Sequence, residues 1–357
     1  MERAPRGYDA PMARLRTVSP NSKGWTRRRA GRGFVYLDHT GARLSDEDVE
    51  RIRSVVIPPA WEDVWICPQA NGHIQAVGVD AAGRRQYLYH PDWRVKRDQL
   101  KFDRVAEVAR KLPRVRAAIL EHIALDGMPA ERAVATAVRL HDLGYFRIGS
   151  DANADTNGSF GLTTLEKRHV RRQRGRLLFE FTGKSGIEHA IEIDDPLAVA
   201  AVETMRRRRG GGDRLLAYKD LRLWTPMDAA MVNDYLRECT GAEITAKDFR
   251  TWHATVLAAA ALAGSDEPGD TKTSRKRAVV AAMKEVAEYL GNTPTIARNS
   301  YVDPRVIDLY EDGVTIATAV RRSYDSPDEQ QRALERAVSR MLDSAPAQRG
   351  RAARRTT

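Results

Sequence analysis

Cysteine and long apolar segments are scarce in this sequence. It has two cysteines in 357 residues, Cys67 and Cys239, and neither has a second cysteine or a histidine at zinc-finger spacing. A disulfide framework and a structural zinc site are therefore excluded. No apolar run approaches the roughly 18 residues of a membrane-spanning helix, and the first residues lack the apolar core of a signal peptide. These absences predict a cytoplasmic protein.

Motifs for nucleotides and catalytic metals are missing as well. Gly183-Lys184-Ser185 looks like the end of a phosphate-binding loop, but that pattern requires a glycine where the sequence has Leu178. The residues on both sides alternate in hydrophobicity, so a hairpin is expected there. No His-Glu-x-x-His motif or cluster of carboxylates indicates a catalytic metal. We expect no ATP, dinucleotide or metal cofactor.

Basic residues outnumber acidic residues in this sequence. Lysine and arginine number 59 against 48 aspartate and glutamate, the net charge is +11, and only 11 of the basic residues are lysine. A basic chain favours a polyanionic partner, and the planar guanidinium of arginine can hold phosphate through two hydrogen bonds. An arginine-rich genome would produce the same bias. The composition therefore favours a nucleic acid as partner and leaves that alternative open.

Two compositional halves follow one another along the chain. Between Phe34 and Tyr89, short β-rich runs alternate with turn signals, and one short helix is expected near Ser45–Ser54 with Ser45 as its N-cap. Farther on, the apolar spacing becomes helical. The expected helices lie at 104–125, 129–143, 163–172, 196–209, 226–239, 246–263 and 272–290. One hairpin interrupts them, with its turn at Gly183–Gly186.

These halves predict an α+β protein with a small β-rich domain followed by a larger, mainly helical domain that contains the hairpin. At roughly 150 residues per domain, the length also suggests two domains. The expected organisation is a flexible N-terminal segment at 1–23, the β-rich domain at 24–97, the helical domain at 98–344 and a basic flexible tail at 345–357.

Five segments carry a resemblance to a known family. Four of them resemble, in order, the catalytic segments of type IB DNA topoisomerases of the poxvirus-like and bacterial branch: YFRIGSD (145–151), FTGKSG (181–186), KDFRTWHAT (247–255) and EYLGNTPTIARNSYVDP (288–304). The fifth, RRQYLYHPDWRVKR (84–97), resembles the DNA-facing element of that family's small domain. The similarity spans about Gly24 to Tyr310.

The resemblance implies a fold and a partner. Its two domains would form a clamp around double-stranded DNA, and the chain would act as a monomer associated with the nucleoid. One strand would be cut through a covalent 3′-phosphotyrosyl intermediate and then resealed. Positive and negative supercoils would both relax, without ATP or metal.

The resemblance also assigns roles to dispersed residues. Transesterification at a phosphodiester needs a nucleophile, neutralisation of charge on the non-bridging oxygens, and a proton for the departing oxygen. Tyr301 matches the nucleophile, Arg147 and Arg250 match the phosphate-binding arginines, and Lys184 matches the general acid. The alternatives are a tyrosine packed at a helix end, solvated arginines and an exposed turn lysine. No residue is identified as the general base toward Tyr301, and water can serve.

Asn292 departs from the family pattern, because poxviral and eukaryotic relatives carry histidine at this position. An amide can donate a hydrogen bond to a phosphate oxygen but cannot transfer a proton, so electrostatic stabilisation is its expected role. The alternative is a helix C-cap, since Gly and Asn after a helix readily adopt the left-handed conformation.

In the N-terminal half, Gln86, Tyr87 and Tyr89 match family residues that face DNA, and Arg97 follows in a basic run. Glutamine can read an adenine edge and tyrosine can pack against sugar or base. The alternative is an amphipathic strand with half-buried tyrosines.

Two other functions compete with a topoisomerase. Tyrosine recombinases share the Arg, Lys, Arg and Tyr chemistry, but they usually carry a His-x-x-Arg motif where this sequence has Lys247, and their N-terminal domain tends to be helical. A non-catalytic DNA-binding protein is the alternative from another class, and an unreactive Tyr301 would be its signature.

Overall fold

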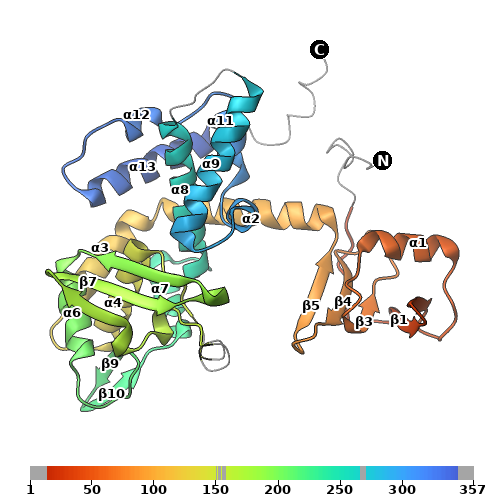
Figure 1. Ribbon diagram of the computed structural model, residues 1–357, viewed down its shortest axis with the longest axis horizontal. Coiled ribbons are helices and arrows are strands. Elements are labelled where there is room, and N and C mark those ends of the chain that lie inside the picture. The colour runs from red at the N-terminus through yellow and green to blue at the C-terminus, as the bar shows by residue number, and fades with distance from the viewer. Residues whose placement is uncertain (1–13, 150, 152–153, 155–157, 266–270, 345–357) are drawn as a thin grey trace. The chain divides into compact units, whose positions relative to one another are not determined.

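The fold is that of a computed structural model, which describes residues 14–149, 151, 154, 158–265 and 271–344. Its contacts divide the chain into two compact units, one ending at Phe102 and the other beginning at Asp103 (Figure 1). The division falls inside helix α2 (Pro91–Ala109). Residues 1–13 of the expected N-terminal segment and the whole expected tail, 345–357, lie outside the described residues.

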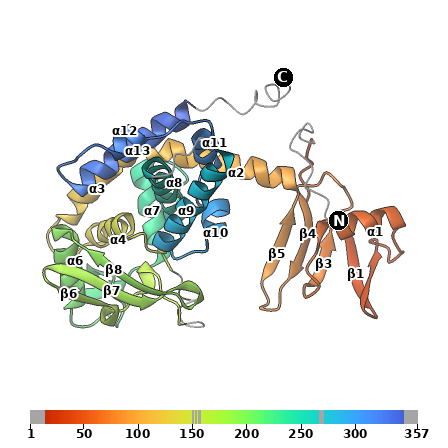
Figure 2. The same cartoon turned by 45° about the horizontal axis from the view of Figure 1, so that its top comes forward.

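The first unit contains an antiparallel five-stranded sheet in the order β2-β1-β3-β4-β5. Figure 2 shows β5, β4, β3 and β1 side by side. The strands and the helix of this unit are β1 (Trp25–Ala30), β2 (Gly33–Leu37), α1 (Asp46–Val55), β3 (Glu62–Ile66), β4 (Ile74–Val79) and β5 (Arg85–Tyr89). The β-rich half and its single helix are thus confirmed, and β5 is an edge strand.

Local chemistry explains how this unit forms. The Ser45 hydroxyl accepts a hydrogen bond from the Asp48 main-chain N–H, which confirms the expected N-cap of α1. Ile52 of α1 packs with Val64 and Ile66 of β3 in a small core. The Arg16 N–H donates to the Asn71 carbonyl, so a described part of the expected flexible segment hydrogen-bonds to the β3–β4 connection.

The second unit is mainly helical and carries two small sheets. A three-stranded sheet has the order β6-β7-β8, and β9 pairs with β10. The helices are α3 (Leu112–Ile123), α4 (Ala130–Gly144), α6 (Pro196–Arg206), α7 (Ala229–Thr240), α8 (Ala246–Gly264), α9 (Lys272–Leu290), α10 (Pro294–Ser300), α11 (Pro304–Glu311), α12 (Ala317–Val320) and α13 (Pro327–Asp343). The strands are β6 (Val170–Gln173), β7 (Arg176–Thr182), β8 (Glu188–Ile193), β9 (Ala217–Asp220) and β10 (Leu223–Pro226). The α+β class is confirmed.

Two expected helices are wrong. The segment expected as one helix at 104–125 is the end of α2 followed by α3, and Pro113 in the first turn of α3 explains the break because proline cannot continue a preceding helix. The segment expected at 163–172 forms two short 3₁₀ turns and strand β6. Pairing of β6 with β7 prevails over the local helical pattern, since tertiary contacts routinely override weak propensity.

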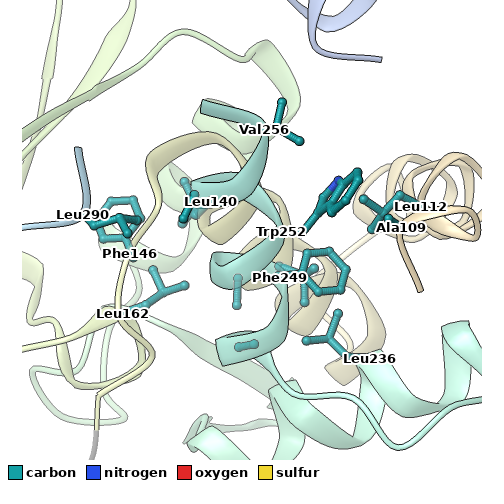
Figure 3. Close-up of a cluster of buried hydrophobic side chains, with 14 of the residues drawn as sticks. Ala109, Leu112, Leu140, Phe146, Leu162, Leu236, Phe249, Trp252, Val256 and Leu290 are labelled. Carbon is teal, nitrogen blue, oxygen red and sulfur yellow. The ribbon is translucent and has the colours of Figure 1, made fainter. Parts of the chain in front are cut away.

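Helix α8 lies at the centre of the second unit. Its apolar residues Phe249, Trp252 and Val256 pack among side chains from the surrounding helices (Figure 3). Buried residues occur on every face of α8, as is typical of a helix enclosed by the rest of a domain. Because α8 is enclosed, the polar side chains that it carries, including Arg250, are buried as well.

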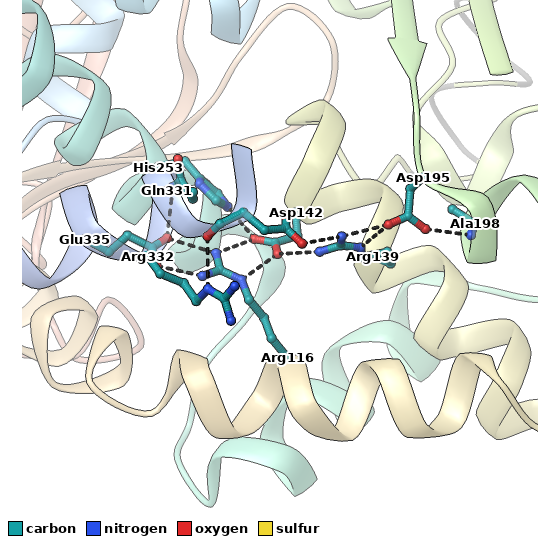
Figure 4. A network of polar contacts seen from close by, with 10 residues as sticks. Arg116, Arg139, Asp142, Asp195, Ala198, His253, Gln331, Arg332 and Glu335 are labelled. Atoms are coloured by element: carbon teal, nitrogen blue, oxygen red, sulfur yellow. Dashed lines mark hydrogen bonds and ion pairs between the residues drawn. The ribbon is translucent and has the colours of Figure 1, made fainter. Parts of the chain in front are cut away.

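A buried network of ion pairs ties α13 to α3 and α4 (Figure 4). Arg116 of α3 contacts Asp142 at 2.7 Å and Glu335 of α13 at 2.6 Å. Arg139 of α4 contacts Asp195 at 2.7 Å. Each of these charges is paired, so the network satisfies the usual requirement for burying ionic groups. Within the described chain, no helix is long and apolar enough to cross a membrane.

Candidate active site

Arg147 joins the segment after α4 to the end of α9. Its Nη2 donates to the Gly291 carbonyl at 2.6 Å and to Asn292 Oδ1 at 2.5 Å. Two residues earlier, Tyr145 ends α4 with a left-handed backbone (φ 52°), an uncommon conformation for a residue other than glycine. The turn at Tyr145 directs the chain from α4 toward α9.

Arg250 projects from α8 toward the same place and is only 4% exposed. Its guanidinium donates to the main-chain carbonyls of Tyr145 and Leu290, which follow α4 and end α9. Its Cζ lies 5.7 Å from the centroid of the Tyr301 ring. The structure therefore brings Arg147, Arg250 and Asn292 together with Tyr301.

These two arginines have neutral hydrogen-bond partners and no carboxylate. Neither forms an ion pair within the described residues. The pKa of Arg250 is lowered to about 10, first by burial and second by the charge of Arg147, and Tyr301 opposes the change. Burial also lowers the pKa of Arg147. Two positive charges held close together without an acid leave a strongly positive site.

Asn292 has separate roles for its main chain and its side chain. Gly291 has the left-handed backbone, with φ 56°, and the Asn292 N–H closes the end of α9 by donating to the Ala287 carbonyl at 2.9 Å. Among the described residues with positive φ, Asn292 does not occur. The C-cap therefore depends on Gly291 and on a main-chain N–H, which leaves the Asn292 amide to contact Arg147.

Three donors of this site lack partners. Arg147 Nη1, Arg250 Nε and Asn292 Nδ2 are buried, and none has a hydrogen-bond partner among the described residues. Buried polar atoms are nearly always hydrogen-bonded in folded proteins, because an unpaired one costs about 1–3 kcal/mol. The site thus has unpaired N–H donors on three neighbouring side chains, and donors of this kind suit an anion with several oxygens.

Tyr301 stands directly after α10 and is half-buried. Its N–H donates to Ala297, and its carbonyl accepts from Thr255 Oγ1 at 3.3 Å. The same Thr255 hydroxyl accepts from the Asp303 N–H at 3.1 Å, where α11 begins. Thr255 lies on α8 with Arg250 and fixes the main chain around Tyr301. The sequence analysis assigned no role to Thr255, although it lies within the KDFRTWHAT motif.

Lys184 does not contact the other candidate residues of the site, which are Arg147, Arg250, Asn292 and Tyr301. It is exposed in the turn between β7 and β8, which closes through a 2.7 Å hydrogen bond from the Gly183 N–H to the Ile187 carbonyl. Its ammonium makes no hydrogen bond or ion pair to the described residues. The turn itself adjoins the site, because Gly183 lines the same small pocket as Arg147 and Arg250.

His189 also lines that pocket and was missed by sequence reasoning. It is half-buried on β8, and burial together with the charges of Arg147 and Arg250 lowers its pKa. The only sequence signal for it is its place in the strand after the FTGKSG motif. Within the described residues, no group of three or more His, Cys, Asp or Glu side chains could hold a metal ion.

The N-terminal candidates lie on β5 and α2. The rings of Tyr87 and Tyr89 stack with centroids 6.0 Å apart, and the Arg97 guanidinium lies 5.4 Å from the centroid of Tyr89. Gln86 lies on the opposite face of the strand, since adjacent residues alternate, and its Nε2 donates to Asp80 Oδ2 at 2.9 Å. The structure thus groups Tyr87, Tyr89 and Arg97 and separates Gln86 from them.

Comparisons with known proteins cover both units. Residues 90–321 match the family model described as eukaryotic DNA topoisomerase I, catalytic core, and residues 33–80 match the one described as bacterial DNA topoisomerase IB, N-terminal domain. DNA topoisomerase 1B of Acanthamoeba polyphaga mimivirus is 28% identical over 298 residues, covering 81% of this chain and 88% of the relative. DNA topoisomerase 1B of Vaccinia virus (strain Copenhagen) is 22% identical over 303 residues, covering 79% and 88%.

Proposed function

Because this chain belongs to the type IB DNA topoisomerases, enzymes that act on DNA, we propose that it relaxes supercoiled duplex DNA by cutting and resealing one strand. The observation that carries the proposal is the set of unpaired donors on Arg147, Arg250 and Asn292, next to Tyr301. These donors have no acceptor among the described residues, and the two non-bridging oxygens of a phosphodiester would serve as their acceptors.

The reaction is a transesterification. The Tyr301 hydroxyl gives its proton to water and its oxygen attacks the phosphorus, while the bond from phosphorus to the 5′ oxygen breaks. Lys184 gives a proton to that leaving oxygen, and the strand remains joined to Tyr301 through its 3′ phosphate. The free strand rotates about the intact one, and the reverse reaction then reseals the cut.

Charge develops on the non-bridging oxygens in the transition state, and the site is arranged to meet it. Arg147 and Arg250 are held by main-chain carbonyls, so they need not reorganise when the oxygens gain charge. The Asn292 amide is oriented by Arg147, because its oxygen accepts from Arg147 and its nitrogen is left free to donate.

The energy of the phosphodiester bond is retained in the tyrosyl ester, so the reaction requires no ATP. The two arginines, Asn292 and Lys184 supply the charge stabilisation and the proton, so it requires no metal. Rotation has no preferred sense, and positive and negative supercoils both relax. One chain carries all five groups of the site, which supports a monomer that closes as a clamp on duplex DNA. Tyr87, Tyr89 and Arg97 contact the DNA from the N-terminal unit, and Gln86 contacts it from the other face of β5.

The test is relaxation of a supercoiled plasmid in EDTA without nucleotide, followed by denaturation to trap a protein–DNA adduct. We expect topoisomers that differ by one in linking number and an initial rate linear in protein. Tyr301→Phe should bind DNA but form no adduct. Strict dependence on magnesium, or an adduct with Tyr301→Phe, would contradict the proposal.

The same assay separates a recombinase from a topoisomerase. A recombinase brings two duplexes and several subunits together before strands exchange. Activity that rises with a high power of protein concentration, requires paired sites and yields joined duplexes would therefore indicate a recombinase even if Tyr301 is the nucleophile.

A further inference from the structure

The imidazole of His189 fills the space between the Lys184 turn and the end of α9. A Cβ added to Gly183 would lie 2.6 Å from the ring, and one added to Gly291 would lie 2.5 Å from it. Real Cβ contacts below 3.0 Å essentially never occur, so the ring occupies the space that a side chain would need at both glycines. These glycines directly precede Lys184 and Asn292.

A stack of rings connects His189 to the segment that carries Arg147. The His189 ring stacks on Phe181 with centroids 5.0 Å apart and an interplanar angle of 21°. Phe181 stacks in turn on Phe146, with centroids 5.9 Å apart. Phe146 is 1% exposed and directly precedes Arg147. The stack begins in the core of the unit, so it holds the imidazole in a defined position.

The surroundings of His189 favour a neutral ring. Burial lowers the pKa of His189 most, the charges of Arg147 and Arg250 lower it further, and Glu188 opposes the change. A neutral imidazole adds no charge to the site and acts through its shape. The ring lies directly beside the segments that carry Lys184 and Asn292, and Phe181 connects it to the segment that carries Arg147.

We propose that His189 is a positioning residue that sets the separation between the Lys184 ammonium and the phosphate-binding donors of Arg147 and Asn292. This inference rests on the proposed function, because the separation matters only if Lys184 protonates the leaving oxygen. Misplacement of a reacting group by about 1 Å can cost roughly 100-fold in rate. Removal of the ring should therefore slow the proton transfer while leaving the tyrosine and the donors in place.

The experiment compares two leaving groups. A duplex carries its mapped cleavage site with either the normal 5′ oxygen or a 5′ sulfur bridging to phosphorus, and formation of the covalent adduct is followed in a single turnover. A thiolate leaves without a proton. We expect His189→Ala to slow cleavage of the oxygen substrate by about 10- to 100-fold and to cleave the sulfur substrate at nearly the parental rate.

Two further variants sharpen this result. His189→Phe keeps a flat ring and should retain most of the rate on the oxygen substrate. The double variant His189→Ala/Lys184→Ala should be no slower than Lys184→Ala, because both changes impair the same proton transfer. As a matched control, His122→Ala removes a half-buried imidazole that contacts Tyr235 and should leave cleavage unchanged.

Each contrary result is specific. An equal defect of His189→Ala on both substrates, or a double variant slower by the product of the single effects, would overturn the positioning role. So would a His189→Phe variant that folds like the parent and is as slow as His189→Ala. If Lys184→Ala itself is not rescued by sulfur, the proposed function of Lys184 fails instead.

Discussion

Two groups of buried arginines in the second unit differ in their partners. Arg116 and Arg139 are paired with carboxylates from three other parts of the chain, namely α4, α13 and the start of α6 (Figure 4). Burial opposes their charge, but Asp142, Glu335 and Asp195 raise the pKa of these arginines above the usual value. Arg147 and Arg250 are instead held by carbonyl and amide oxygens, and their pKa values are lowered.

The difference shows that hydrogen-bond satisfaction and charge compensation are separate requirements. A carbonyl can orient a guanidinium but does not cancel its charge, whereas a carboxylate does both. In the paired group nothing remains to attract a ligand, so the charges stabilise the contact of α13 with α3 and α4. In the site the charges of Arg147 and Arg250 are not compensated by a carboxylate, as the proposed binding of a phosphate requires.

The two groups meet at Tyr145. His253 Nε2 of α8 lies 3.0 Å from Asp142 Oδ1, and the His253 ring packs edge-on against Tyr145 with centroids 4.9 Å apart. The Tyr145 carbonyl in turn accepts from Arg250. The ion-pair network thus supports the backbone turn that holds Arg250, and it includes α13, which lies beyond the residues matched by the catalytic-core family model.

The largest expected effect is on the stability that comes from Arg116, Arg139 and their carboxylate partners. Arg116→Met leaves Asp142 and Glu335 buried without their cation, and the free energy of unfolding should fall by about 3–5 kcal/mol. Urea denaturation of the parent and the variant measures this change. Adduct formation by the folded fraction, assayed at low temperature, should change less than tenfold. An unaltered denaturation curve would mean that the network contributes nothing to stability.

The matched change in the site should have the opposite profile. In the proposed reaction Arg147 donates to the phosphate, so Arg147→Ala should lower the single-turnover cleavage rate by about 100- to 1,000-fold. The thermal midpoint should stay close to that of the parent, because no buried carboxylate loses its partner. A variant that unfolds easily but cleaves at the normal rate would assign Arg147 to the structural group.

Variants of Asn292, the uncharged donor of the site, test whether its side chain acts in cleavage or only in ending α9. Asn292→Ala should slow cleavage by about 10- to 1,000-fold with nearly unchanged thermal stability, since the main chain of residues 291 and 292 ends α9. Asn292→His can still donate and should keep more activity. A C-cap role for the side chain predicts lost stability with normal cleavage, and equal rates for Asn292→Ala and the parent would rule out the donor role.

The smallest expected effect is the loss of folding stability at low pH that results from protonation of Asp142. Burial opposes ionisation of Asp142, but Arg116 holds the pKa of Asp142 well below its usual range. A depressed folded-state pKa contributes stability that is present above the unfolded pKa of roughly 4 and is lost as the pH falls. By pH 3 the loss from this group should be about 1 kcal/mol. Urea titrations of the parent and of Asp142→Asn at pH 7, 5 and 3 measure the difference, and identical pH profiles would contradict the assignment.

Local sequence determined much of this protein. The Ser45 cap, the hairpin turn at Gly183–Gly186, and helices α8 and α9 were predicted because each depends on residues close together in the chain. The short motifs also identified Arg147, Arg250, Asn292 and Tyr301 as candidates through their resemblance to a family. Their joint placement around one site, however, is a property of the folded chain.

Tertiary structure alone decided the features that involve distant residues. Arg147 and Asn292 are separated by 145 positions, and no local pattern predicts their hydrogen bond or the unpaired donors beside it. The same holds for His189, whose ring fits between Gly183 and Gly291 only because β8 and the end of α9 pack together. Strand β6 formed where a helix was expected because its pairing with β7 prevailed over local preference. Sequence specifies elements and residue types through short-range physics, whereas partners and burial arise only when distant segments pack together.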